Sequence, residues 1–321
     1  MEVRKVQETG NGTLFTTLPK EWCKKHAINK GSMLSIELKE DGLLLIYPFT
    51  KEDTRSEITF SYEHNELYKI IDNIIGSYLL GYTIIEVISK NALNIEERDK
   101  IRDIISKLVG LEIVEETFNR IRIKFILDPN ELSPDTIFSR MSFISESMMT
   151  DIIKAIEHNF DSKILESVVK RENELDRQYF LLIRLLRTIL MRPKLSVQYN
   201  ISPIEVMDRR MAAYFLELVG DLTASFSEEL KEKAPIFLKE INIAHFKELM
   251  LNVIEIYHKS ITAVLKKNRH YAEGVNDEYE KISEILSQTP KENIHLINLL
   301  DYLLKVSKAT VDITDLAAAL Y

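Results

Sequence analysis

The sequence predicts a multidomain protein with a small β-rich head, an α/β middle module and an all-α C-terminal region. Three patterns along the 321 residues support this fold class. Residues 1–48 carry short β-branched runs between glycine turns, residues 57–127 alternate strand and helix patterns, and residues 136–321 repeat apolar residues at helical spacing. At about 150 residues per domain, this length fits two or three domains.

The head is predicted to contain five short elements. We expect strands at 3–7 and 13–18, a helix at 20–26, and a hairpin of strands 33–38 and 43–47. Pro19 precedes the helix, where proline suits the first turn. Because a unit of fewer than about 50 residues rarely buries enough apolar surface alone, we expect the head to dimerise.

The middle module alternates strands and helices. We expect strands at 57–62 and 82–89, helices at 66–80 and 95–108, and paired strands at 112–118 and 120–127. This order predicts a small α/β sandwich. It contains no phosphate-binding glycine loop and no nucleophile elbow, so its role stays open between a brace, a dimer contact and a ligand sensor. Residues 128–135 are expected to be a linker.

The C-terminal region contains six blocks of helical periodicity, at 138–159, 161–190, 203–233, 242–268, 270–289 and 293–320. One break is expected at Ala234–Pro235, because proline disfavours a helix interior. The blocks form two triplets, and such a repeat predicts two tandem three-helix bundles, at about 136–233 and 242–321.

Composition and charge restrict the class of protein. Apolar residues make up 45% and charged residues 29%, as in ordinary globular proteins. Residues 1–30 carry six Lys or Arg against three acids, a net charge of +3. Because the whole chain has a net charge of −8, the remaining residues carry −8 − 3 = −11. A basic head on an acidic body suggests that only the head approaches a polyanion. The alternative is a solvated basic patch.

Cysteine usage and hydropathy indicate the compartment. The single cysteine, Cys23, excludes an internal disulfide and a finger-type zinc site, and it suits a reducing cytosol. The first residues are polar, and no apolar run reaches the roughly 18 residues that cross a bilayer. We therefore expect a cytoplasmic protein without direct membrane insertion.

Two pairs of acids are the strongest chemical signal. Glu217 and Asp221 lie one turn apart in one predicted helix, and Glu172 and Asp176 lie one turn apart in the helix before it. Like charges at this spacing repel, and pairs on adjacent helices can converge on a cation, as in carboxylate sites of helical bundles. Gly220 lets another helix approach. The alternative is an acidic solvated face, or a site neutralised by nearby arginines such as Arg177 and Arg210.

A third pair, Glu273 and Asp277, is a weaker candidate that a surface role explains better. Oxygen ligands without cysteine favour Mg, Ca, Mn or Fe over Zn. The predicted cofactor is therefore a divalent or trivalent metal ion among Fe, Mn, Mg, Ca and Zn.

The acidic segments resemble those of the PhoU family of phosphate-signalling proteins. Residues 215–223 are similar to the family's ERIGDHA segment, with Leu218 and Leu222 at the arginine and histidine positions, and residues 170–177 are similar to its earlier acidic motif. The resemblance implies two three-helix bundles with metal ligands on neighbouring helices. In the second bundle, Leu304 and Lys308 stand where acids are expected.

The head resembles the AbrB/SpoVT swapped-hairpin DNA-binding domain. The similar segments are 3–6, the Gly10 turn, 18–21 and 30–34. The resemblance implies that two chains interlace into one barrel and that basic residues meet double-stranded DNA. The matching positions are Arg4, Lys5 and Lys24, with Lys20 and Lys25 nearby. Cys23 stands where a basic residue is common, and the loop from Gly10 to Leu18 is longer than usual.

Archaeal PhoU-like regulators with an AbrB-like head join these two parts in the same order. The resemblance implies a non-enzymatic, DNA-binding regulator of phosphate uptake. It would be a homodimer or larger, and a phosphate ABC transporter or phosphate-signalling protein would be a further partner. One alternative is a dimeric interaction scaffold without DNA binding. Another is a carboxylate-metal bundle enzyme, which is disfavoured because Glu255 and His258 form a single Glu-x-x-His without a matching pair.

Overall fold

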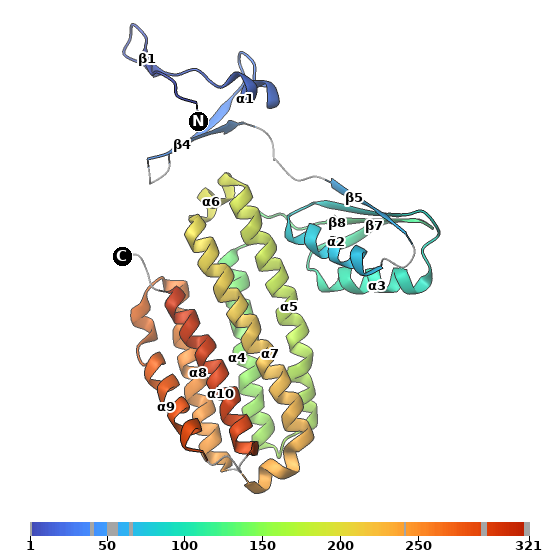
Figure 1. Cartoon of the computed structure of the whole chain (residues 1–321), viewed down its shortest axis with the longest axis vertical. Coiled ribbons are helices and arrows are strands. Elements are labelled where there is room, and N and C mark those ends of the chain that lie inside the picture. The colour runs from blue at the N-terminus through green and yellow to red at the C-terminus, as the bar shows by residue number, and fades with distance from the viewer. Residues whose placement is uncertain are drawn as a thin grey trace. The chain divides into compact units, whose positions relative to one another are not determined.

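A computed structural model describes residues 2–38, 42–49, 57–63, 67–240, 242–289 and 294–317. The chain divides into two compact units, residues 1–53 and residues 54–321 (Figure 1). The predicted fold class is confirmed, with a small β-containing N-terminal unit, then an α/β sheet, then a helical region.

Unit 1 contains two small hairpins and one short helix. Its elements are β1 (Gln7–Glu8), β2 (Leu14–Phe15), α1 (Lys20–Lys25), β3 (Leu34–Leu38) and β4 (Leu44–Pro48). The first hairpin is shorter than predicted, because only Gln7 with Phe15 and Glu8 with Leu14 pair across it. The second pairs five residues on each strand, and the expected turn residues Glu40 and Asp41 lie outside the described residues.

The described part of unit 1 has no core of its own. No side chain is buried among residues 2–36, 38 and 42–49. Large apolar side chains on the second hairpin face solvent instead, with Ile36 64% exposed and Leu38 75% exposed. An exposed apolar surface of this kind is typical of an interaction site.

Unit 2 begins with a four-stranded sheet of order β5-β6-β8-β7. Its strands are β5 (Glu57–Tyr62), β6 (Ile84–Ser89), β7 (Leu111–Glu116) and β8 (Arg120–Phe125), with α2 (Leu67–Leu79) and α3 (Ile95–Lys107) between them. β5 runs parallel to β6, and the other pairs are antiparallel. Both helices lie on one side of the sheet (Figure 1), where side chains such as Ile85 and Ile123 are fully buried.

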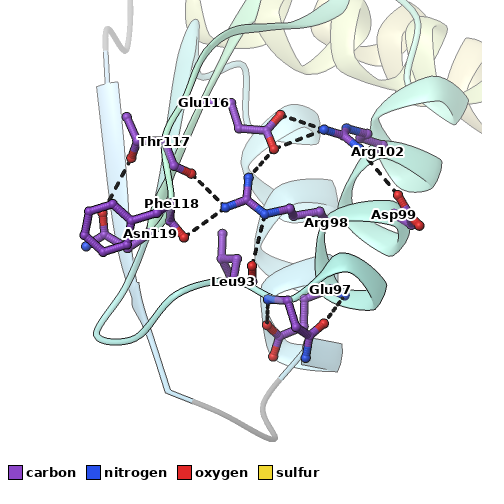
Figure 2. A network of polar contacts seen from close by, with 10 residues as sticks. Leu93, Glu97, Arg98, Asp99, Arg102, Glu116, Thr117, Phe118 and Asn119 are labelled. Carbon is purple, nitrogen blue, oxygen red and sulfur yellow. Dashed lines mark hydrogen bonds and ion pairs between the residues drawn. The ribbon is translucent and has the colours of Figure 1, made fainter.

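Arg98 joins α3 to the turn between β7 and β8 (Figure 2). Its guanidinium pairs with Glu116 and donates hydrogen bonds to the carbonyl oxygens of Thr117 and Phe118, both at 2.9 Å. The helix start beside it is stabilised by a capping box, in which Asn94 accepts from the Glu97 amide. These contacts attach α3 to the sheet within the module.

The helical region contains two groups of three long helices. The elements are α4 (Pro134–Glu157), α5 (Ser162–Met191), α6 (Pro193–Tyr199), α7 (Pro203–Glu240), α8 (Ile243–Lys266), η1 (Arg269–Ala272), α9 (Val275–Gln288) and α10 (Ile294–Leu316). α4, α5 and α7 pack together, α8, α9 and α10 pack together, and α7 and α10 join the groups (Figure 1). None of the described helices is long and apolar enough to cross a membrane.

The structure corrects two of the predicted helix boundaries and adds one helix. α7 continues through the expected break at Ala234–Pro235 and ends at Glu240. Since Pro235 lies near the end of a 38-residue helix, its missing N–H affects only the last turns, and the helix continues to Glu240. α4 begins at Pro134 inside the expected linker, with Ser133 as its cap, and α6 was not predicted.

Arg184 on α5 locks the α/β module onto the helices. Its guanidinium donates to the carbonyl oxygens of Tyr78 and Tyr82 and lies 3.7 Å from the centre of the Phe125 ring. Gly81 has φ of +83°, and a Cβ there would lie 3.2 Å from the Thr188 hydroxyl oxygen. The module and the bundle therefore pack as one compact unit, and their division into separate domains stays a prediction.

Candidate functional site

The two predicted acid pairs meet where α5 and α7 pack against each other. One carboxylate oxygen from each of Glu172, Asp176 and Asp221 lies within 4.8 Å of the other two. Glu217 is one turn before Asp221 on α7 and is half-buried beside them. We call Glu172, Asp176, Glu217 and Asp221 the acidic cluster.

Gly220 makes this approach of the helices possible. A Cβ at Gly220 would lie 2.1 Å from Cδ2 of Leu175, a distance that no packed pair of carbons tolerates. Leu175 precedes Asp176 on α5, and Gly220 precedes Asp221 on α7. The small residue therefore sets the spacing between the two helices at the level of the carboxylates.

The acidic cluster is electrostatically strained without a cation. Burial raises the pKa of Glu172 to about 7, with further contributions from the charges of Asp176 and Asp221. Burial, followed by the three other acids, raises the pKa of Glu217 to about 7. The pKa values of Asp176 and Asp221 are raised as well, chiefly by burial. A bound cation would favour the ionised forms of all four.

No ion pair among the described residues neutralises the acidic cluster. The predicted alternative, a balance by Arg177 or Arg210, has no salt bridge to support it within 4.0 Å. The charge of Lys107 at the end of α3 lowers the pKa of both Glu172 and Asp176 but does not overcome the effect of their burial. Sequence analysis did not find Lys107, because only tertiary packing brings α3 to α5.

The five basic side chains of unit 1 that the sequence predicts to meet DNA divide into one paired and four unpaired groups. Arg4 pairs with Glu2 and donates to the Thr17 hydroxyl at 2.5 Å. The others form no salt bridge among the described residues and are exposed, namely Lys5 and, on α1, Lys20, Lys24 and Lys25. The last two also lie in the final turn of α1, where a cation complements the helix dipole.

Comparisons with known proteins bear on both sites. Residues 138–230 match the model of the PhoU domain, and residues 7–54 match the model of the antidote-toxin recognition domain MazE, a bacterial antitoxin. The chain carries a PhoU domain behind a MazE/AbrB-type domain. No curated protein and no solved structure matches the chain.

The PhoU match contains the whole acidic cluster. It begins in α4 at residue 138 and ends in α7 at residue 230, so it covers the helices that carry all four acids. The matched segment is the half of the helical region in which the acids converge.

The third acid pair lies beyond the PhoU match and does not form a cluster. Gly274, with φ of +83°, separates Glu273 from the start of α9, so Glu273 and Asp277 do not share a helix. Both side chains are exposed. Lys308 on α10, which stands where the family motif has an acid, pairs with Asp312 at 2.7 Å. Within the described residues, only Glu172, Asp176 and Asp221 gather as three potential metal ligands.

The Glu-x-x-His pair considered for an enzyme is engaged elsewhere. Glu255 pairs with Lys259 at 2.7 Å, and His258 lies 3.3 Å from Glu146. The two side chains therefore point to different partners, and neither belongs to the acidic cluster.

Proposed function

We propose that the protein is a non-enzymatic, DNA-binding regulator of phosphate uptake. Its PhoU domain would respond to a bound metal ion or to phosphate. The observation that carries this proposal is an acidic cluster that forms no ion pair with any described residue, inside a PhoU domain and behind a MazE/AbrB-type head. The head would bring the molecule to DNA, and the bundle would supply the signal.

The donor set of the acidic cluster fits a metal ion. Glu172, Asp176 and Asp221 would hold the ion, and Glu217 would supply a fourth carboxylate. Carboxylate oxygens favour Mg, Ca, Mn or Fe, and Zn is a weaker match for a site without nitrogen or sulfur. Because only ionised carboxylates bind metal well, affinity should rise with pH through about 7.

The missing core of unit 1 supports a dimer. Apolar side chains that are exposed in one copy, such as Ile36 and Leu38, would be buried by the hairpins of a second copy. A two-fold interlaced head would also place two α1 helices on one assembly, which suits a DNA site with two half-sites.

The free lysines of unit 1 support contact with DNA. Lys5, Lys20, Lys24 and Lys25 are exposed and form no ion pair among the described residues. Each phosphate that they neutralise would release counterions, so binding should weaken steeply with salt. Arg4 would first have to leave Glu2, and its contribution should be smaller.

A signal between the bundle and the head requires a ligand that favours one arrangement over another. α5 is the natural element for it, because it carries Asp176 and, two turns later, the Arg184 that binds the α/β module. A cation at the acidic cluster would also repel Lys107 of α3. A phosphate transporter or signalling protein would be a second partner of the same state.

The test is selection of genomic DNA fragments by the full-length protein, beside a Lys24→Glu/Lys25→Glu variant. We expect enrichment of fragments upstream of phosphate-transport genes, lost in the variant and changed by metal. The matched control is Lys281→Glu/Lys305→Glu, which alters charge on α9 and α10. Absence of enrichment at low salt would reject DNA binding and favour an interaction scaffold.

A further inference from the structure

Strand β5 is an edge of the sheet whose outer hydrogen-bonding groups have no strand beside them. Among the described residues β5 pairs only with β6. The Lys90 amide donates to the Tyr62 carbonyl at 3.2 Å, which turns the backbone groups of Tyr62 toward β6. By the alternation of a parallel ladder, the N–H and C=O of Thr59 and Ser61 face outward.

The opposite edge of the sheet is protected, and β5 is not. On β7 the register shifts between Ile113 and Glu115, and Glu112, Glu115 and Glu116 line the strand. Bulges and charges of this kind prevent edge-to-edge pairing. β5 reads EITFSY, with no proline, no irregular pairing and one acid at its start.

The side chains of β5 are also left incompletely covered. Ile58 and Phe60 point to the helix-covered side and are only half-buried, whereas Ile85 and Val87 on β6 are fully buried. Glu57 on the other side is already paired with Arg122 at 3.1 Å. The strand therefore offers an apolar edge with its one charge neutralised.

We propose that β5 pairs antiparallel with β5 of a second copy, about a two-fold axis at Thr59. The two four-stranded sheets would become one continuous sheet. In this register Thr59 faces the partner's Thr59, and Ile58 faces the partner's Phe60. Thr–Thr pairs and aromatic pairs with β-branched residues stabilise antiparallel strands.

The acids favour this register over its neighbour. Centred on Thr59, the pairing puts Glu57 opposite the partner's Ser61. Centred on Phe60, it would put Glu57 opposite the partner's Glu63, and two facing acids are the less favourable pair even though Arg122 and Lys90 already pair with them.

A second copy is the occupant that chain connectivity favours. Only residues 50–56 lie between the described part of unit 1 and β5. Two copies joined at their heads would therefore hold their β5 strands at high effective concentration. For this proximity alone the inference rests on the proposed dimer, and it does not depend on DNA binding or on metal.

The test is disulfide trapping in the full-length chain with Cys23→Ser as background. In the proposed register, Thr59→Cys would bring its two Cα atoms to about 5.5 Å, within the range of a disulfide. Ser61→Cys on the same strand would separate them by about 14 Å, beyond that range. Val114→Cys on β7 is the control for the protected edge.

We expect Thr59→Cys to form a covalent dimer under mild oxidation at least tenfold faster than either control. Light scattering of the reduced proteins reports the dimer independently. Equal or absent trapping in a chain that is dimeric would overturn β5 pairing and leave the head dimer standing. A chain that is monomeric and is not trapped would overturn both β5 pairing and the head dimer. If Thr59→Cys is trapped although the heads do not dimerise, β5 pairing is retained and the head dimer is rejected.

Discussion

The two halves of the helical region carry similar acidic motifs, but the acids come together in the first half and stay apart in the second. In the first half, Gly220 lets α5 and α7 approach until their carboxylates meet. In the second half, α9 begins only after Gly274, so Glu273 lies outside the helix that carries Asp277, and both acids are exposed to solvent. The comparison teaches that an acid motif becomes a site through the distance between helices, since the motif itself is common to both.

The largest expected effect is loss of metal binding when the acidic cluster loses its ligands. We expect Asp176→Asn/Asp221→Asn to weaken binding of Mn²⁺ at least about 100-fold, or about 2.8 kcal/mol, measured by calorimetric titration. Glu273→Gln/Asp277→Asn is the matched pair from the second half and should change the affinity less than about twofold. Equal losses in the two double variants would erase the contrast between the halves.

A smaller loss is expected when the helices are forced apart. In Gly220→Ala the new methyl group would collide with Leu175, at a cost of about 1–3 kcal/mol of stability despite the better helix propensity of alanine. The shifted carboxylates should bind metal about tenfold more weakly.

Gly76→Ala on α2 is the control for this substitution, because no atom lies within 4 Å of a Cβ there. It should stabilise the chain by up to about 1 kcal/mol in thermal or urea unfolding. A Gly220→Ala protein with wild-type stability and affinity would show that helix spacing does not define the site.

The pH dependence of stability should separate the acidic cluster from exposed acids. Burial, then neighbouring carboxylates, raises the pKa of Glu172 and Glu217 to about 7, above the unfolded value of about 4.3. Their contribution to stability is therefore fully present below about pH 4.3 and is lost as pH rises through about 7.

In the presence of a chelator, the melting temperature of the wild-type chain should fall by a few degrees more than that of Glu172→Gln/Glu217→Gln between about pH 5.5 and about pH 8. Glu273→Gln should follow the wild-type curve. Parallel curves for wild type and the cluster variant would mean that these two carboxyl groups titrate normally.

The smallest expected effect concerns Lys107. Its charge opposes a cation at the acidic cluster, so Lys107→Ala should raise metal affinity about two- to threefold at about pH 8, where the acids are ionised. Lys305→Ala, which breaks an ion pair with Asp301 on α10, should leave affinity unchanged. A decrease for Lys107→Ala would assign this lysine to holding α3 in place.

Local patterns predicted much of this architecture. Alternating strands and long amphipathic helices were recognisable because periods of 2 and 3.6 are written directly in the chain. The acid pairs and Gly220 were also recognisable, since their meaning depends on one or two turns of helix. Two failures involve proline, because Pro193 begins the short helix α6 and Pro235 lies inside α7, and a third is the first hairpin, which pairs only two residues on each strand.

Two features depended on tertiary contacts and carry no local signal. Lys107 is 65 residues from Glu172 in the sequence, and only the docking of α3 on α5 brings them together. Arg184 on α5 also binds the α/β module through the carbonyl oxygens of Tyr78 and Tyr82, and nothing in the local sequence indicates these partners. Such pairings need knowledge of how two elements meet.

The described part of unit 1 buries no side chain by itself, so folding of the head would depend on how many chains are present to assemble. If the head folds only as it assembles, the amount of competent head grows with the square of chain concentration when chains are scarce. Halving the synthesis of this protein would then lower the amount of assembled heads about fourfold. The exposed apolar hairpin of unit 1 would thereby make the activity of the head sensitive to the concentration of the protein in the cell.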